Sequence, residues 1–324
     1  METIGDIGEF GLIERIARVT PSASCVVEGI GDDCAVVRAA NGLLLVSCDL
    51  FLEGIHFSLE TARPRDIGWK AAASALSDIA AMGGRPLCCV VSLACPADCE
   101  VAVLESVYAG LVEAAACCEA AVVGGDTART AERILLDVTA IGEPAAGRYL
   151  TRKGAQPGDL LAVTGRLGLA AAGLCALEHA HDAPELTRAH HRPTPRIKEG
   201  QWLAARPDVH AMIDISDGLV QDAGHLAEAG EVGVDIDPAL LRPAPALARY
   251  CDEHSRDPVS FMLSGGEDYE LAFAISMQSA GEILEAFRAE FHTGIATVGA
   301  FTGAWPGVRV GGKPPSQSGF DHFR

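Results

Sequence analysis

The sequence lacks the features that mark several large classes of protein. No apolar run approaches the length of a transmembrane helix, and the first residues, Met1 to Asp6, are acidic and unlike a signal peptide. Lys and Arg together number only 25 against 44 Asp and Glu, giving a formal net charge of −19. Because polyanions attract basic surfaces, we expect no nucleic-acid partner. The missing apolar span favours a cytoplasmic protein with no membrane partner.

Several catalytic and metal-binding motifs are missing as well. The eleven Cys are odd in number and include no CxxC pair, which argues against a zinc site and favours reduced thiols. There is no GxxxxGKS/T P-loop, no protein-kinase catalytic loop and no nucleophile elbow. Gly29 and Gly31 match the first two glycines of the GxGxxG dinucleotide-binding fingerprint, but Cys34 stands at the position of the third glycine. This difference disfavours a nicotinamide-dependent enzyme.

What the sequence does contain is an alternation of strand and helix patterns in a chain of 324 residues, 49% of them apolar. We therefore expect an α/β fold with mixed sheets of the α+β kind. Gly, Pro and basic residues gather between Pro144 and Pro157, which predicts two domains, residues 1–145 and 146–324. The stretch 178–195 is expected to be irregular. Predicted helices cover 8–20, 64–82, 98–120, 167–177, 196–205, 219–229 and 279–291, and predicted strands cover 35–37, 43–49, 87–93, 121–123, 134–142, 159–164, 210–214, 233–237, 271–275, 297–299 and 307–310.

Carboxylates recur beside Gly or Ser at the edges of these elements. Asp32 and Asp33 follow a glycine pair, and neighbouring Asp side chains repel unless a cation lies between them. Oxygen ligands of this kind suit Mg²⁺. Asp78 is out of character in an Ala-rich helix, because an unpaired buried carboxylate is costly. Two alternatives remain open: Asp32 and Asp33 could belong to an Asp-rich surface turn, and Asp78 could face solvent. The further carboxylates of this type are Asp49, Asp126, Asp214, Asp217, Glu267 and Asp268.

Two glycine-containing turns favour phosphate binding. After the predicted strand 121–123, the amides bared by Gly124 and Gly125 could approach phosphate oxygens while Asp126 holds a cation. Asp214 and Asp217 straddle a strand-to-helix turn, so both can face one site, and the helix N-terminus favours an anion. A plain helix cap at residues 216–217 is the alternative.

Basic residues and a lone histidine add weaker indications. Arg148, Arg152 and Lys153 lie close together in a chain with few basic residues, either near an anion site or as ordinary surface charges. His56 follows the acid-ended strand 43–49, which leaves a ligand contact and a structural role equally open.

Seven motifs, in order from one end of the chain to the other, resemble the thiamine-monophosphate kinase family of the aminoimidazole-ribonucleotide-synthetase-like superfamily. They are GIGDDCAVV (29–37), SCDLFLEGIHF (47–57), ALSDIAAMG (75–83), GGDT (124–127), LTRKGAQPGDLLAVTG (150–165), IDISDGL (213–219) and SGGEDYEL (264–271). The resemblance implies two α/β domains, with an N-terminal one that pairs in a homodimer and a C-terminal one that closes over the nucleotide. It also implies ATP-dependent phosphorylation of thiamine monophosphate to thiamine diphosphate, by direct in-line transfer with several Mg²⁺ ions.

The resemblance assigns roles to individual residues. Cys48 stands where the family often has Thr, a change without effect if only the backbone oxygen binds metal. Phe320 stands where Tyr is common, so this chain would lack a hydroxyl contact to the substrate. The implied metal ligands are Asp33, Ser47, Cys48, Asp49, Asp78, Asp126, Asp214 and Asp217, of which Asp126, Asp214 and Asp217 are the implied catalytic residues. The implied ATP contacts are Gly125, Asp126, Arg152, Ser216 and Tyr108, and the implied substrate contacts are His56, Glu267 and Phe320.

Two other functions are compatible with the same residues. One is another ATP-using enzyme of the superfamily, of the aminoimidazole ribonucleotide synthetase or selenophosphate synthetase type; for the latter, Cys25 does not lie in the expected Gly-rich loop. The other is a non-catalytic module that binds Mg²⁺ and nucleotide, which would need fewer carboxylates than this chain carries.

Overall fold

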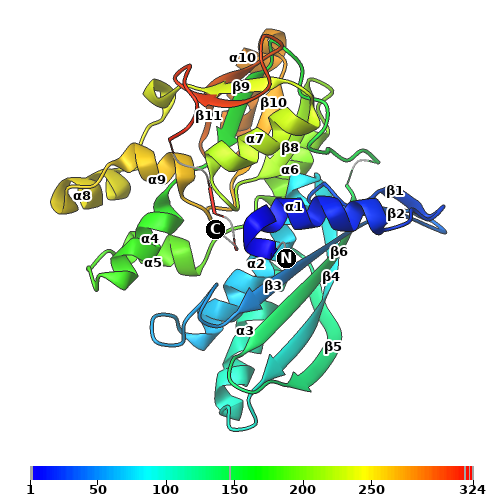
Figure 1. The fold of residues 1–324 in the computed structure, drawn as a ribbon, viewed down its shortest axis with the longest axis vertical. Helices are drawn as coiled ribbons and strands as arrows, with labels where there is room; N and C mark the ends of the chain where they lie inside the picture. The colour runs from blue at the N-terminus through cyan, green and yellow to red at the C-terminus, as the bar shows by residue number, and fades with distance from the viewer. Residues whose placement is uncertain (1–2, 146, 317–318, 321, 323–324) are drawn as a thin grey trace.

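The fold has two halves, each built on a six-stranded mixed sheet (Figure 1). The computed structural model describes residues 3–145, 147–316, 319–320 and 322. The strand order is β1-β2-β3-β6-β4-β5 in the first sheet and β12-β9-β11-β7-β10-β8 in the second. The first half contains α1 (Ile4–Val19), β1 (Val26–Glu28), β2 (Ala35–Ala39), β3 (Gly42–Leu52), α2 (Pro64–Ala81), β4 (Gly84–Cys95), α3 (Val101–Cys117), β5 (Ala121–Arg129) and β6 (Leu135–Pro144). The second half contains β7 (Leu160–Thr164), α4 (Leu169–Glu178), α5 (Pro184–His191), α6 (Ile197–Ala204), β8 (Val209–Asp214), α7 (Leu219–Ala229), β9 (Gly233–Ile236), the 3₁₀ turn η1 (Pro238–Leu240), α8 (Pro245–His254), α9 (Pro258–Ser264), β10 (Leu271–Ile275), α10 (Met277–Glu290), β11 (Ile295–Thr302) and β12 (Gly307–Val310).

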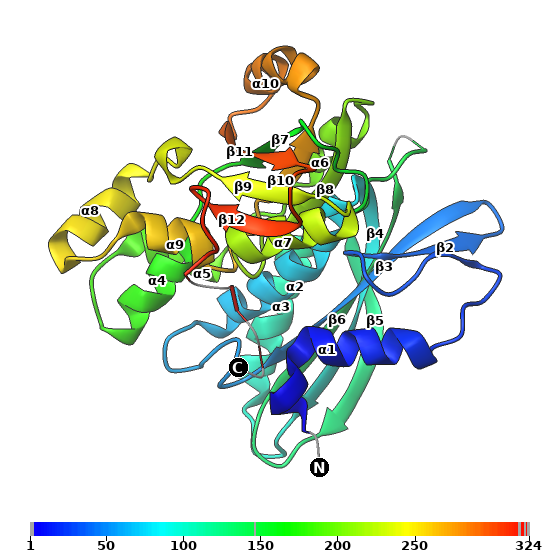
Figure 2. The same ribbon diagram turned by 45° about the horizontal axis from the view of Figure 1, so that its top comes forward.

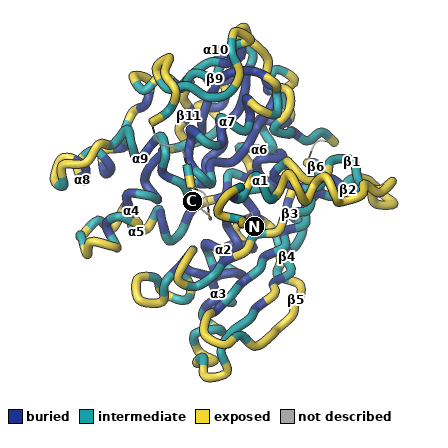
Figure 3. Tube along the Cα trace, in the orientation of Figure 1, coloured by how far each residue is buried: buried dark blue, intermediate teal, exposed yellow. Residues whose placement is uncertain are grey.

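Helices α2 and α3 cover one face of the first sheet and leave its other face open. The small side chains of α2 let it pack closely on β3, β4 and β6. Glycine is required where the two helices touch, because a Cβ on Gly68 would lie 1.8 Å from the carbonyl oxygen of Val107. On the open face, β5 is exposed along almost its whole length (Figure 3).

The second sheet joins the two halves. Alternate residues of β10 point to opposite faces: Leu271 and Phe273 belong to a core shared with α2, whereas Ala272 belongs to a core under α7. The C-terminal segment returns to the N-terminal helix, since the backbone N–H of His322 donates to Glu9 Oε2 at 3.4 Å (Figure 2). Within the described ranges, no helix combines the length and hydropathy needed to span a bilayer.

The expected α/β class with mixed sheets is confirmed, but three local expectations were wrong. Strand β3 continues to Leu52 instead of ending at Asp49. Strand β5 runs on to Arg129, because Gly125 lets it pass close to β4: a Cβ there would lie 1.8 Å from the Val91 oxygen. The stretch expected to be irregular contains α5, which Pro184 begins.

Candidate active site

A cavity of about 1230 Å³ lies between the two halves of the chain. Strand β3 and helix α2 line it from the first half, and α4, the turn before α7 and the segment 264–269 line it from the second. The described part of the C-terminal tail closes one side. Of the residues predicted to form the site, those that line the cavity are Cys48, Asp49, His56, Asp78, Asp214, Ser216, Asp217, Glu267 and Phe320.

Three buried or half-buried carboxylates meet beside this cavity, and two of them, Asp78 and Asp214, line it. Asp33 precedes β2, Asp78 lies in the last turns of α2, and Asp214 ends β8. One ligand oxygen from each lies within 4.8 Å of the other two. Asp33 Oδ2 is buried and has no hydrogen-bond partner among the described residues. The predicted convergence of acidic side chains from both halves is therefore present for these three residues.

The electrostatics of this group indicate missing positive charge. Burial, and then the negative charge of Asp33, raises the pKa of Asp214 to about 8. Burial, followed by the charges of Asp49 and Asp214, raises the pKa of Asp78 well above its ordinary value. A carboxylate whose ionised form is this unfavourable needs a cation or a proton. The orphaned oxygen and the all-oxygen donor set fit a divalent cation such as Mg²⁺.

Strand β3 distributes its predicted ligands between the two faces of the sheet. Ser47 and Asp49 point inward, where the Ser47 hydroxyl donates to Asp78 and the Ser74 hydroxyl donates to Asp49. Cys48 points outward, and its Sγ donates to Asp137 Oδ1 at 3.0 Å. The Cys48 side chain is therefore directed away from the carboxylate cluster, so its thiol is not placed to act as a ligand there.

Of the basic group near the connection between the two halves, only Arg152 reaches the carboxylates. Its guanidinium donates to Asp33 Oδ1 from Nε at 3.0 Å and from Nη2 at 2.5 Å, and its backbone N–H donates to Asp32. Arg148 instead donates to three backbone carbonyls between residues 204 and 209, a structural role. Composition alone treats these two arginines alike, whereas the family resemblance names only Arg152 as an ATP contact.

A second acidic group surrounds the start of α7. Asp217, Asp222 and His225 each offer a ligand atom within 4.8 Å of the others. Burial raises the pKa of Asp217 to about 6, although its carboxylate accepts from Gln221. Asp222, which the sequence reading missed, accepts from the backbone N–H groups of Asp217 and Gly218 and so shapes the turn. No clear signal in the sequence indicated this role, because Asp222 lies inside α7 and not at its N-cap.

The predicted substrate contacts line the same cavity. His56 Nδ1 accepts from the Leu52 backbone N–H at 2.9 Å, and burial lowers its pKa. Glu267 forms an ion pair with Lys70, whose Nζ lies 2.5 Å from Oε1. The Phe320 ring is exposed, and its backbone N–H donates to the Asp217 oxygen at 3.1 Å. Lys70 was missed because a lysine in a helix usually reads as a solvated residue.

Three predicted residues lie apart from this group. Gly125 and Asp126 are on β5 and Tyr108 is on α3, and none of them is among the described residues that line the cavity. Ser92 on β4 pairs with Asp126 on β5 and with Asp137 on β6. Residues paired across neighbouring strands point to the same face of a sheet, so Asp126 and Asp137 both point to the open outer face. The expectation that Asp126 follows the end of a strand was wrong, and a single copy of the chain does not bring it to the carboxylate cluster.

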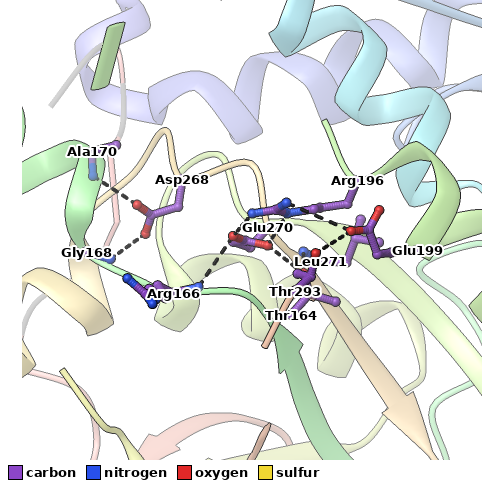
Figure 4. A network of polar contacts seen from close by, with 10 residues as sticks. All are labelled: Thr164, Arg166, Gly168, Ala170, Arg196, Glu199, Asp268, Glu270, Leu271 and Thr293. Carbon is purple, nitrogen blue, oxygen red and sulfur yellow. Dashed lines mark hydrogen bonds and ion pairs between the residues drawn. The ribbon is translucent and has the colours of Figure 1, made fainter. Parts of the chain in front are cut away.

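The loop that carries Glu267 is fixed on both sides (Figure 4). The Asp268 carboxylate accepts from the backbone N–H groups of Gly168 and Ala170 at the start of α4. The Glu270 carboxylate accepts two hydrogen bonds from Arg196, at 2.7 and 2.5 Å, and one from Thr164. Burial raises the pKa of Asp268 to about 7. These neighbours, and not substrate contacts, explain the remaining carboxylates of the 267–270 motif.

Comparison with known proteins agrees with this geometry. Residues 31–143 match the family of AIR synthase related proteins, N-terminal domain, and residues 156–309 match its C-terminal domain. The chain is 38% identical to the thiamine-monophosphate kinase of Escherichia coli (strain K12) over 98% of both chains, and 36% identical to that of Bacillus subtilis (strain 168) over 90% of both. A solved structure described as AaThiL complexed with AMPPCP and TMP matches 99% of both chains with a TM-score of 0.89 at 34% identity. E. coli HypE, a hydrogenase maturation protein, shares the fold at 21% identity and a TM-score of 0.69. The chain therefore belongs to the thiamine-monophosphate kinase family of phosphotransferases.

Proposed function

We propose that this enzyme transfers the γ-phosphoryl group of ATP to thiamine monophosphate and so forms thiamine diphosphate. The observation that carries the proposal is the meeting of Asp33, Asp78 and Asp214 at a large cavity in a chain that resembles thiamine-monophosphate kinases along its whole length. Such a cavity can hold two phosphate compounds end to end. A cytoplasmic location is part of the same proposal.

The carboxylate cluster would hold Mg²⁺ through Asp33, Asp78 and Asp214, with Asp49, Asp217 and the oxygens of Ser47 and Cys48 as further ligands. Bound Mg²⁺ supplies charge neutralisation for the phosphates of both substrates. The protein itself positions the ligands: Arg152 forms an ion pair with Asp33 and so holds the segment around residue 152 beside the carboxylate cluster. Ser216, at the start of α7, would contact ATP together with Arg152.

The chemistry asks little covalent help from the protein. An oxygen of the acceptor phosphate forms a bond to the γ-phosphorus while the bond to the bridging oxygen breaks, and ADP leaves with that oxygen. The acceptor oxygen is already ionised, so no side-chain base is required. In-line alignment and excluded water are then the main contributions of the fold. His56, Glu267 and Phe320 would bind the remainder of thiamine monophosphate.

The open face of the first sheet supports a homodimer. It exposes β5 with Gly125 and Asp126, together with apolar side chains such as Val123 and Leu50. Pairing of this face with a second copy would cover Gly125 and Asp126 and place them near a nucleotide, whereas Tyr108 lies on α3, behind the opposite face of the sheet. A nucleotide contact of Tyr108 is kept as a separate part of this proposal. The division into domains at residues 145 and 146 is kept as part of this proposal.

A direct assay tests the function. The purified chain is mixed with ATP, Mg²⁺ and thiamine monophosphate, and ADP and thiamine diphosphate are measured by chromatography. Parallel reactions replace thiamine monophosphate by thiamine, which lacks the acceptor phosphate, or by substrates of the other enzymes of the superfamily. Stoichiometric ADP and thiamine diphosphate support the proposal. Binding of ATP without turnover would favour the non-catalytic alternative, and turnover of another substrate would favour a different member of the superfamily.

A further inference from the structure

Lys70 is a buried cation in a helix that otherwise presents small apolar residues to the core. Only 3% of its surface is exposed, although lysine is among the residues least often buried. Its Nζ lies 2.5 Å from Glu267 Oε1. The contact joins α2 of the first half to the 264–270 loop of the second half at the cavity wall. An isolated buried ammonium group would be costly, so its position depends on this carboxylate.

His190 completes the group but does not supply its charge. Its Nε2 lies 3.5 Å from Lys70 Nζ, and its Nδ1 lies 3.3 Å from Glu267 Oε2 without hydrogen-bond alignment. Burial, followed by the positive charge of Lys70, lowers the pKa of His190 to about 2. The imidazole is therefore neutral in the folded protein. Among the described residues, Lys70 is the only charged cation that pairs with Glu267.

The backbone of the loop and the Glu267 side chain are held by different contacts. Asp268 and Glu270 anchor the loop on each side of Tyr269. Glu267 and Tyr269 both adopt positive φ angles, 66° and 51°, which non-glycine residues rarely do and which the anchors must maintain. These anchors do not reach the Glu267 carboxylate, which faces the cavity with 27% of its side chain exposed. Its direction is set chiefly by Lys70.

We propose that Lys70 is a positioning residue for the acceptor substrate: it holds the Glu267 carboxylate in the direction that contacts the acceptor. The proposal rests on the proposed function, because it concerns the acceptor end of the same site. Lys70 acts through Glu267 and need not touch the substrate. Lys70 pairs with Glu267 and not with the carboxylate cluster or Arg152, so its loss should weaken acceptor binding more than nucleotide binding.

The test is a double-mutant cycle on the full chain with Lys70→Met, Glu267→Gln and the double variant. Each is measured for the KM of thiamine monophosphate, the KM of ATP, kcat, and the dissociation constant of thiamine monophosphate without nucleotide. We expect Lys70→Met to raise the acceptor KM by about 10- to 100-fold, with an ATP KM within about 3-fold of the wild type. Because Lys70 acts through Glu267, Lys70→Met should have little further effect in the Glu267→Gln background. Lys198→Met, which changes an exposed lysine on α6, is the matched control and should leave all four values unchanged.

The cycle also separates positioning from a merely structural role. Equal losses for both substrates, or additive effects of the two substitutions on the acceptor KM, would overturn the proposal. If Lys70→Met alone does not fold, the double variant replaces both partners by neutral side chains of similar size and should fold. Its acceptor KM must then match that of Glu267→Gln. If the wild type binds thiamine monophosphate without turnover, only the proposed function is refuted, because the dissociation constants of the four proteins still test the role of Lys70. If the wild type does not bind thiamine monophosphate at all, both proposals are refuted.

Discussion

Replacing Asp214 by Asn should make the metal-free protein more stable while abolishing its activity. The folded state raises the pKa of Asp214 from an ordinary value of 3.8 to about 8, because the side chain is buried and lies beside Asp33. The folded protein therefore binds more protons than the unfolded chain between these two pH values. Stability without a cation should fall as the pH rises through this window and level off above it.

The expected size follows from the same shift. One pKa unit corresponds to about 1.4 kcal/mol, so ionising Asp214 in the metal-free fold costs about 6 kcal/mol relative to the unfolded chain. Neighbouring carboxylates share protons with Asp214, which reduces the benefit of removing a single charge. We therefore expect Asp214→Asn to gain about 2 to 4 kcal/mol at pH 8 in EDTA, about 1 kcal/mol at pH 5 and nearly nothing near pH 3. Saturating Mg²⁺ should stabilise the wild type at pH 8 and remove much of this difference.

Urea denaturation at several pH values, with EDTA or with Mg²⁺, measures these free energies of unfolding. Asp126→Asn is the matched control: it makes the same chemical change at a carboxylate exposed on the outer face of the first sheet. Its free energy of unfolding should stay within about 0.5 kcal/mol of the wild type. Turnover should fall by orders of magnitude in both variants.

Two results would refute the reasoning. A loss of stability on Asp214→Asn at pH 8 in EDTA would mean that the carboxylate is stabilising without a cation. Near-normal turnover in both Asp variants would remove these residues from the proposed metal site.

Three further substitutions test other parts of the structure. Gly68→Ala should cost about 2 to 3 kcal/mol in urea denaturation, because its Cβ would meet the Val107 carbonyl and push α3 away from α2; wild-type stability would contradict the close helix contact. Glu270→Gln should cost about 3 to 5 kcal/mol by the same measurement, since it leaves the guanidinium of Arg196 with only its longer contact to Glu199, at 3.9 Å, and a neutral effect would contradict a role of this network in fixing the loop. Phe320→Tyr should lower the KM of thiamine monophosphate by a few-fold if the added hydroxyl makes the contact that the family commonly has, and an unchanged KM would show that the ring alone suffices.

The parts of the fold that could be predicted were those set by local sequence. Hydrophobic periodicity identified most helices and strands, and the motif at Asp33 and the out-of-place Asp78 pointed to the cluster that the structure contains. The course of β5 could not be read in this way. A pair of glycines usually ends a strand, so Gly124 and Gly125 suggested an end. The contact with β4 shows instead that Gly125 allows the pairing of β5 with β4 to continue.

Partners from distant parts of the chain were also beyond the sequence. Arg148 and Arg152 look alike in a basic segment, yet one binds backbone carbonyls and the other binds Asp33. Lys70 and His190 lie 120 residues apart and acquire their roles only where both meet Glu267. Periodicity reports which face of an element is buried, but not which element covers it.

The contrast between Asp214 and Asp126 connects stability with assembly. A carboxylate binds a cation most strongly where water is excluded, and the buried cluster achieves this at a cost to the metal-free fold. Asp126 lies on the open face of the first sheet, two strands and so about 10 Å away from Asp137. A cation bound to such an exposed carboxylate would be held weakly. It could contribute as strongly as the cluster only if something covers that face. A second copy that packs on β5 would cover this face without changing the fold of either chain. Under the proposal, the full set of predicted ligands would then act together only when two chains associate.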